Sequence, residues 1–284
     1  MAGAAMPSST VKANIDTNKS YLFPFILVTS LFFLWGFAYG LLDILNKHFQ
    51  DVLEVTKRRS TLLQFAYFGA YFLMALPAGF FMNKFGYKKG ILLGLVLYAI
   101  GAFLFYPAAG ALSFNGFLAA LFILACGLAC LETAANPYVT ILGKSETSEF
   151  RLNLSQCFNG AGSSLGAYIG GQLFLEDKTG VVNTTKDLTI VQTTYIVIGI
   201  VVVLIAMFFF RTPLPEIRED KEEGSNAAVK VKPLFSHSHF VWGIITQFFY
   251  VAAQVGVAAL FINYVTEYWQ GTTSRQASSL LAIG

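Results

Sequence analysis

Glu132 lies near the middle of residues 121–143, an apolar stretch that reads LFILACGLACLETAANPYVTILG and is long enough to cross a bilayer. A carboxylate inside hydrocarbon is costly, so such a residue usually faces a cavity or a partner instead of lipid. Helical spacing places Glu132, Asn136 and Thr140 on one face. We expect this face to hydrogen-bond a polar solute within the membrane. The alternative is a buried carboxylate that its neighbours satisfy and that binds nothing.

Pro137 follows Glu132 in the same stretch. Its missing N–H leaves the carbonyl of Thr133 without its helical partner. Irregular backbone at membrane depth is tolerated where it borders protein or a water-filled cavity. The sequence therefore predicts a broken helix beside Glu132, with one face for lipid and one for polar solutes.

Asp43 is the second acid within a membrane segment, and it follows the first apolar run, residues 21–42. A carboxylic acid away from water favours its neutral form, so it can take up and release a proton. The alternative is a local ion pair with Lys47, four residues on. Side chains recur at spacing four along this helix, at Trp35, Tyr39, Asp43 and Lys47.

Three further helices carry polar side chains at helical spacing. Any single stripe could be ordinary hydrogen bonding between helices, worth about 1 kcal/mol or less per bond. Several stripes in one chain instead predict a shared polar path. The stripes are Gln64, Tyr67 and Tyr71 on the second helix, Asn153, Gln156, Asn159 and Ser163 on the fifth, and Gln247, Tyr250 and Gln254 on the seventh.

The residue types along this path indicate what it would bind. Carboxylates and side-chain amides offer donors and acceptors to hydroxyl groups. The rings of Trp35, Tyr39 and Tyr67 offer flat apolar faces. This mixture suits a small polyhydroxylated solute such as a monosaccharide. It suits an ion alone less well, because the aromatic rings would have no role.

The composition is that of a polytopic membrane protein. The chain has 284 residues, of which 55% are hydrophobic and only 12% charged, and its mean hydropathy is +0.60. The net charge of +3 gives no reason to expect a nucleic-acid partner. Cys126 and Cys130 are spaced so that they could share a metal, but packing is the favoured role. We expect no disulfide framework, metal or cofactor.

Seven apolar segments are each near or above the ~20 residues that span a bilayer. An eighth begins at residues 277–284. We predict an all-α protein with a disordered cytoplasmic tail (1–20), a six-helix bundle (21–211), a charged cytoplasmic linker with three prolines (212–239) and the start of a second bundle (240–284). The segments are residues 21–42, 61–82, 90–109, 114–142, 152–175, 190–210 and 240–264.

The third and sixth segments, 90–109 and 190–210, contain no ionisable residue. We expect them at the periphery, facing lipid. With the N-terminus in the cytoplasm, 12 Lys and Arg residues would face inside and seven outside. This bias favours a multi-pass protein of the plasma or inner membrane with a cytoplasmic N-terminus, although the basic cluster 57–59 would lie outside.

Three segments carry a resemblance to a known family. They are FFLWGFAYGLLDILNKHFQ (32–50), LACLETAANPYVTILG (128–143) and FRLNLSQCFNGAG (150–162). The chain resembles the fucose–proton symporter family of the major facilitator superfamily. The resemblance extends through TQFFYVAAQ (246–254), so it covers nearly the whole chain beyond the tail.

The resemblance implies twelve helices in two six-helix halves, a central sugar site and alternating access by rocking of the halves. It implies that Asp43 takes part in proton coupling and that Glu132 recognises sugar. It also implies sugar contacts for Gln156 and Asn159. The full set of expected substrate-binding residues is Glu132, Asn136, Gln156, Asn159, Trp35, Tyr39, Gln64, Tyr67, Gln247 and Gln254.

The loop after the second helix departs from the superfamily pattern G-x-x-x-D-R-x-G-R-R. Its glycines and positive charges remain, but asparagine takes the acidic position. This loop therefore lacks the acid on which the inward-gate salt bridge of that pattern is built. The expected gating residues are Gly79, Asn83, Lys84, Gly86 and Lys88.

The leading interpretation is a secondary transporter that takes up a monosaccharide with protons, and sodium is the alternative coupling ion. An intramembrane enzyme is disfavoured, because His237 and His239 lie in the linker and no H-E-x-x-H or G-x-S-x-G motif occurs within a helix. A third class is a membrane protein that does not transport. Seven helices cannot complete a twelve-helix protein, so we expect either a piece of a longer product or a chain that ends early.

Overall fold

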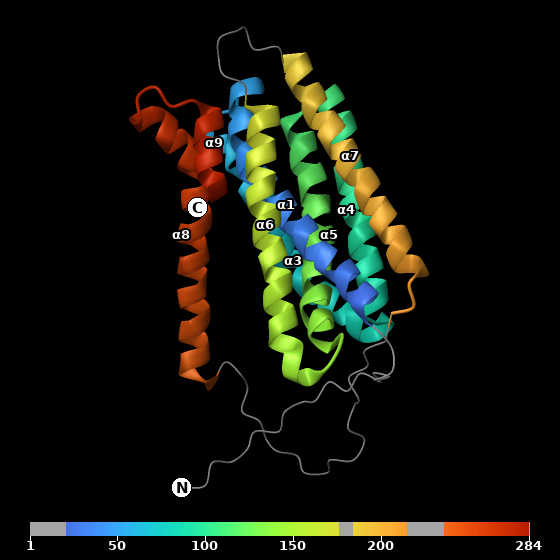
Figure 1. Ribbon diagram of the computed structural model, residues 1–284. Helices are drawn as coiled ribbons and strands as arrows, with labels where there is room; N and C mark the ends of the chain where they lie inside the picture. Colours follow the sequence, from blue (N-terminus) through green and yellow to red (C-terminus); the bar gives the residue numbers. More distant parts are fainter. Residues whose placement is uncertain (1–20, 176–183, 215–235, 284) are drawn as a thin grey trace.

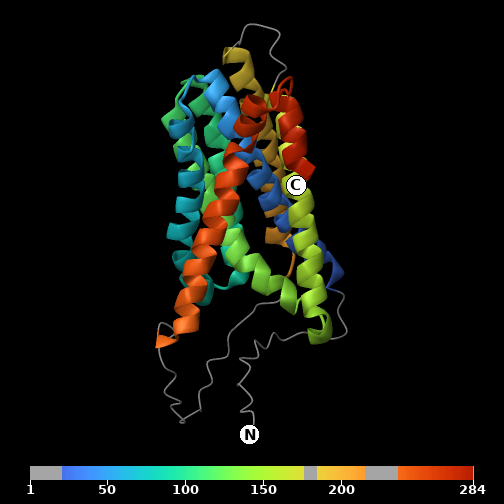
Figure 2. The same ribbon diagram turned by 90° about the vertical axis from the view of Figure 1, so that its left-hand side faces the viewer.

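The protein is described by a computed structural model, which covers residues 21–175, 184–214 and 236–283 (Figure 1). Helices make up nearly all of this part of the chain, and it contains no strand. The long helices run side by side along one direction (Figures 1 and 2). In chain order the elements are α1 (Leu22–Val52), α2 (Lys57–Ser60), α3 (Leu62–Phe85), α4 (Tyr87–Gly110), α5 (Phe114–Ile141), η1 (Ser145–Thr147), α6 (Ser148–Phe174), α7 (Thr184–Arg211), α8 (Ser238–Tyr268) and α9 (Ser274–Ile283).

The helix α1 is longer than the sequence predicts. The apolar run stops at Leu42 and the residues at spacing four stop at Lys47, but the helix continues to Val52. The polar residues beyond Leu42 are buried against neighbouring helices, so they need no exit into water. Asn46 is 0% exposed and His48 is 2% exposed, and each hydrogen-bonds to a main-chain oxygen of another helix.

Glycines bring α1 and α6 into direct backbone contact, as their spacing predicts. A Cβ added at Gly36 or Gly40 would lie 2.1 Å from a main-chain oxygen of α6. A Cβ at Gly162 or Gly166 would lie within 2.4 Å of a main-chain oxygen of α1. We call these four glycines the α1–α6 seam. Because both sides supply glycines, the two helices pack closer than larger residues would allow.

The helix α4 is not peripheral, contrary to the expectation for residues 90–109. It lies between α5 and α7 (Figure 1). Half of the residues in its most apolar stretch of 18 residues are buried. Gly94 and Gly101 allow α5 to approach closely, which explains the burial. The helix α7 packs on the outer side of α4, where Phe105 and Tyr195 stack with centroids 3.7 Å apart. Only 28% of the apolar window of α7 is buried, as expected for a lipid-facing helix.

Six of the described helices are long and apolar enough to span a bilayer: α1, α3, α4, α5, α7 and α8. The helix α6 has 27 residues, so its length suffices, but its polar stripe and many small residues make it less apolar. That α6 crosses the membrane in addition to these six helices stays a prediction. In α1, 67% of the most apolar stretch is buried, and α6 packs on this helix through the seam. This contact supports a place for α6 inside the bundle.

Within the described residues, helix α8 contacts the rest of the protein mainly near its C-terminal end. Just 6% of the residues in its most apolar stretch are buried. The half of the helix near Ser238 diverges from the bundle (Figure 1). Asn46 donates to the main-chain oxygen of Ala259, 2.8 Å away. Arg275 of α9 donates to the main-chain oxygens of Leu175 (3.1 Å) and Gln172 (3.3 Å). We call this end of the molecule, where Asn46 and Arg275 make these contacts, the closed end.

Most of the predicted tail and linker falls outside the described residues. The tail (1–20) is not described at all, and of the linker (212–239) only its two ends are. The proposed division at residues 211 and 240 therefore stays a prediction. The structure does show that α8 begins at Ser238, close to the expected start of the second bundle.

Candidate functional site

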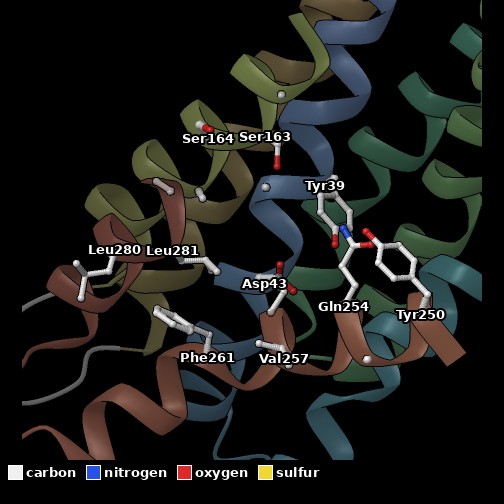
Figure 3. Close-up of a pocket in the computed structure, with 16 residues that line it drawn as sticks. Tyr39, Asp43, Ser163, Ser164, Tyr250, Gln254, Val257, Phe261, Leu280 and Leu281 are labelled. Carbon is white, nitrogen blue, oxygen red and sulfur yellow. The ribbon is translucent and has the colours of Figure 1, made fainter. Parts of the chain in front are cut away.

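A cavity of about 720 Å³ lies between the bundle and α8, and Asp43 is in its wall. Asp43 is 7% exposed. Helices α1, α6, α8 and α9 all contribute to the lining (Figure 3). The polar lining residues are Tyr39, Asp43, Ser163, Ser164, Tyr250 and Gln254.

Asp43 is held by an amide instead of a cation. Gln64 of α3 donates from Nε2 to Oδ1 of Asp43 over 3.3 Å. Lys47 pairs with Asp51 at 3.1 Å, one turn further along α1. The alternative of a local Asp43–Lys47 ion pair is therefore wrong, because Lys47 has a nearer acid on the same face. Among the described ion pairs, none includes Asp43.

Tyr39 and Gln254 face this cavity from opposite helices. Figure 3 shows the Tyr39 hydroxyl of α1 and the Gln254 amide of α8 directed towards the same part of the cavity. Tyr250 lies one turn before Gln254 and contributes its hydroxyl to the same wall. The cavity thus combines a carboxylate, an amide and two aromatic rings. Of the three rings that the sequence predicted, Trp35, Tyr39 and Tyr67, only Tyr39 lines it.

Glu132 belongs to a second polar cluster, and it does not line this cavity. Its carboxylate lies close to the Tyr71 side chain of α3. Asn136 donates to the main-chain oxygen of Glu132 (3.1 Å) and accepts from Gln156 of α6 (3.2 Å). Glu132 and Asn136 are partly buried, whereas Gln156 is exposed. The cluster therefore borders an open surface between α5 and α6.

The predicted break at Pro137 is wrong. The helix α5 runs without interruption from Phe114 to Ile141 with Pro137 inside it. Hydroxyls in this part of the helix donate to main-chain oxygens, from Thr133 to Ala129 (2.7 Å) and from Thr140 to Pro137 (2.7 Å). These bonds, with that of Asn136, go to the main-chain oxygens of Ala129, Pro137 and Glu132, and the helix continues on both sides of the proline.

Several expected contact residues are engaged in packing. The Asn159 amide donates to the main-chain oxygen of Phe32 at 3.2 Å, within the α1–α6 seam. Trp35 is 8% exposed and stacks on Phe32 with centroids 4.6 Å apart. Gln64 and Tyr67 are 7% and 2% exposed and lie behind the cavity wall. These four residues therefore support the site and do not line it.

Gln247 is exposed on the part of α8 that diverges from the bundle. It lies two helical turns from Gln254 and on the same face. The structure does not bring it together with Asp43 or Glu132. Its role as a contact stays a prediction.

The predicted gating loop is anchored within the first bundle. Gly86 ends α3 with φ of +92°, a conformation that favours glycine. Lys88 donates to the main-chain oxygens of Phe210 (3.1 Å) and Thr212 (2.8 Å), so it caps the C-terminal end of α7. Asn83 and Lys84 are exposed, and a Cβ at Gly79 would meet nothing within 4 Å.

Three features of this region were not predicted from the sequence. The cavity includes Ser164 and the apolar side chains Leu280 and Leu281 of α9. Arg151 donates to the main-chain oxygens of Val139 (3.1 Å) and Lys144 (3.0 Å), which caps the end of α5. For Arg151, the only signal in the sequence was an arginine at the start of one helix, just after the end of another. Leu280 and Leu281 gave none, because apolar residues are expected throughout a membrane helix.

No group of three or more His, Cys, Asp or Glu side chains that could hold a metal occurs in the described part of the chain. Cys126, Cys130 and Cys157 are free thiols. The chemistry that the site offers is therefore hydrogen bonding and proton binding by two separate carboxyl groups. One lies in the cavity beside α8, and the other lies between α5 and α6.

These features define a multi-pass helical membrane protein with acids at membrane depth. The profile of the Major Facilitator Superfamily matches residues 24–284, nearly all of the chain. The chain therefore belongs to the Major Facilitator Superfamily.

Two relatives from different bacteria share similar identity with the chain. It is 38% identical to the L-fucose-proton symporter of Escherichia coli over 95% of its own length and 66% of that protein. It is also 38% identical to a glucose/galactose transporter of Brucella abortus, over 94% of its length and 64% of that protein. The chain thus spans just under two thirds of these relatives. The resemblance drawn from its motifs is confirmed.

Solved structures show the same fold. The outward conformation of the E. coli fucose:proton symporter superposes with a TM-score of 0.68 at 36% identity, over 93% of this chain and 68% of that one. A bacterial homologue of the lysosomal transporter Spinster superposes with a TM-score of 0.71 at 14% identity, over 94% and 60%. The second match shows the fold alone.

Proposed function

We propose that this chain forms the sugar- and proton-binding part of a secondary transporter that takes up a monosaccharide by proton symport. The observation that carries the proposal is the position of Asp43. It is buried in the wall of a cavity between the first bundle and α8, with an amide as its partner instead of a cation. An acid in such a place can lose and regain a proton as the cavity opens to each side.

The rest of the site supports a sugar as the solute. Glu132, Asn136 and Gln156 supply a carboxylate and two amides, and Tyr39 and Tyr250 supply aromatic faces. The two relatives named above are transporters of hexoses or of the deoxyhexose fucose. Sodium is the second candidate for the coupling ion, because a carboxylate with free lone pairs can also bind a cation. Neither cluster offers the arrangement of a hydrolytic enzyme, so transport without chemical change of the solute is the function that we propose.

The test is uptake into proteoliposomes, with the chain extended at its C-terminus by a complete second helical bundle. Labelled fucose, galactose and glucose are offered under an inward proton gradient or an inward sodium gradient, each with and without an ionophore. We expect accumulation of at least one sugar under the proton gradient alone. Accumulation under sodium alone would replace the coupling ion, and no accumulation of any sugar under either gradient would contradict the proposal.

A further inference from the structure

An apolar groove of about 610 Å³ runs between α4 and α7, which lie side by side (Figure 1). Its floor is buried, since Leu95 and Ala99 are hardly exposed. Its rim is open, since Val96 and Val203 are exposed. The groove is therefore a hollow in the outer surface of the bundle, and it shares no lining residue with the cavity beside Asp43.

Small side chains create this hollow, and a phenylalanine ends it. Ala99 and Ala206 line the groove among larger apolar residues of the two helices. A Cβ added at Gly199 of α7 would lie 2.7 Å from the Phe103 ring of α4. The Phe103 ring thus packs directly on the backbone of α7, and on α4 it is the last residue that lines the groove.

The groove has the length of one leaflet of a bilayer. On α4 it extends from Leu92 to Phe103. At 1.5 Å per residue, this stretch is about 17 Å long. The hydrocarbon core is about 30 Å thick, so one leaflet contributes about 15 Å. An acyl chain of a single lipid therefore matches the groove in length and in polarity.

One end of the groove carries positive charge. Of the described residues that line it, Arg211 at the C-terminal end of α7 is the one that is not apolar, and it is exposed. Lys89 is also exposed and lies one turn before Leu92, on the face of α4 that lines the groove. Among the ion pairs of the described residues, none includes either cation.

Lys88 holds the start of α4 against the end of α7, so both cations lie at the same end. Its amino group donates to the main-chain oxygens of Phe210 (3.1 Å) and Thr212 (2.8 Å). Carbonyl oxygens at the C-terminal end of a helix carry partial negative charge, which disfavours an anion, and the Lys88 ammonium offsets it. The first turn of α4 contains no acid. This end of the groove therefore favours an anionic group.

We propose that this groove binds an anionic phospholipid of the cytoplasmic leaflet. The Lys and Arg bias places this end of the bundle in the cytoplasm. One acyl chain lies along α4 and α7, and the Arg211 guanidinium binds the phosphate with two parallel N–H groups. Lys89 adds a second cation, which favours a headgroup of net negative charge over a zwitterionic one. Basic pockets between membrane helices on the cytoplasmic side bind anionic headgroups in this way.

A second apolar groove shows what the two cations add. It has a volume of about 560 Å³ and lies between α1, α6 and α7. None of the described residues that line it is charged. It has room for an acyl chain but no partner for a phosphate, so it supplies a matched control.

The test is lipid binding, measured by native mass spectrometry in the version with a complete second bundle. Phosphatidylglycerol and phosphatidylcholine with identical acyl chains are added at equal concentrations. We expect one phosphatidylglycerol to bind on the order of tenfold more tightly than phosphatidylcholine. Arg211→Gln should lower the affinity for phosphatidylglycerol about fivefold and leave that for phosphatidylcholine unchanged. Lys144→Gln removes an exposed cation just after α5, outside the groove, and should change neither affinity.

A second pair of variants tests the apolar part of the groove. Val96→Trp fills the groove from a position that is 50% exposed, so the core is not overpacked. It should lower the affinity for both lipids on the order of tenfold, which corresponds to losing the burial of about two methylene groups. Val197→Trp is the control, because Val197 is 54% exposed and lines the second groove. It should keep the preference for phosphatidylglycerol.

Three results would each overturn the proposal. They are equal affinities of the unmodified protein for the two lipids, a full preference in Arg211→Gln, and equal losses in Val96→Trp and Val197→Trp. Glycerol phosphate, which carries the phosphate without acyl chains, is added as a competitor. It should leave the lipid bound, and displacement at a concentration equal to that of the lipid would mark a site for soluble phosphates instead. No step of this experiment depends on transport, so its result is independent of the proposed function.

Discussion

The side-chain amide of Asn46 in α1 donates a hydrogen bond to the main-chain oxygen of Ala259 in α8, across 2.8 Å. Asn46 is completely buried, so this bond is shielded from water. It lies at the closed end, where Arg275 also donates to the main-chain oxygens of Gln172 in α6 and of Leu175 just after it, and Lys57 pairs with Glu267. At the opposite end α8 diverges from the bundle (Figure 1).

Arg275→Ala should loosen the closed end. It removes two hydrogen bonds from a charged donor, and each such bond contributes about 1.5–3 kcal/mol. We expect a cysteine placed at the buried Asn263, which is 5% exposed, to react with a maleimide roughly tenfold faster in this variant. Arg58→Ala, which removes an exposed arginine of α2, is the control and should not change the rate. Equal rates in both variants would show that Arg275 does not hold this end closed.

The orientation in the membrane can be tested on exposed residues at opposite ends. The Lys and Arg bias predicts a cytoplasmic N-terminus, which places Glu54 outside and Glu146 inside. A membrane-impermeant thiol reagent should label Glu54→Cys in intact cells and Glu146→Cys only after permeabilisation, with Cys126, Cys130 and Cys157 replaced in both. The reverse pattern would invert the topology.

Asp43→Asn should separate exchange from accumulation. Asparagine resembles the protonated acid in shape, can keep a hydrogen bond with Gln64, and cannot release a proton. In the version with a complete second bundle, we expect sugar counterflow to persist while accumulation under an acid-outside gradient is lost. Asp51→Asn removes an acid of the same helix outside the cavity and should keep accumulation. An Asp43→Asn protein that still concentrates sugar would make Asp43 a structural residue.

Glu132→Gln should weaken sugar binding. A hydrogen bond from a hydroxyl to a charged acceptor contributes roughly 1.5–3 kcal/mol. Its loss corresponds to a rise in the dissociation constant of about tenfold or more. Titration calorimetry measures this directly, with the exposed Glu146→Gln as control. Unchanged affinity would assign Glu132 to packing against Tyr71 alone.

The α1–α6 seam should tolerate no larger residue. A Cβ at Gly36 would lie 2.1 Å from the Asn159 main-chain oxygen, so Gly36→Ala forces the helices apart. Overpacking of this kind typically destabilises by about 1–3 kcal/mol. Gly69→Ala, where a Cβ meets nothing within 4 Å, should be neutral or stabilising by up to about 1 kcal/mol because alanine favours a helix. Thermal unfolding in detergent compares the two variants, and equal melting temperatures would contradict a tight seam.

Much of the fold could be predicted because a membrane helix is defined by length and hydropathy, which are local properties. The glycine spacing in α6 also predicted a close helix contact, since only small residues permit one. The end of α1 could not be predicted for the same reason. Hydropathy stops at Leu42, but Asn46 and His48 continue the helix because α6 and α8 supply their partners. A partner on a distant helix leaves no mark in a local window.

The candidate site was predicted in part. Tyr39, Asp43 and Gln254 do meet at one cavity. Helical spacing identified polar faces correctly, but it could not show which neighbour each face meets. Gln64 and Tyr67 therefore appeared as contact residues, although they lie behind the wall. Glu132 and Asp43 were placed on one path, whereas the structure gives each its own cluster with α3 between them.

The α1–α6 seam also bears on how such a protein can diverge in evolution. Substitutions at Gly36, Gly40, Gly162 or Gly166 meet main-chain atoms, so selection must keep these positions nearly fixed. Gln254 and Tyr250 project from a helix with few buried contacts, so they can be exchanged without disturbing the seam. Under the proposed function, a lineage would therefore acquire a preference for a new solute by substitutions on α8, while the seam between α1 and α6 is inherited unchanged.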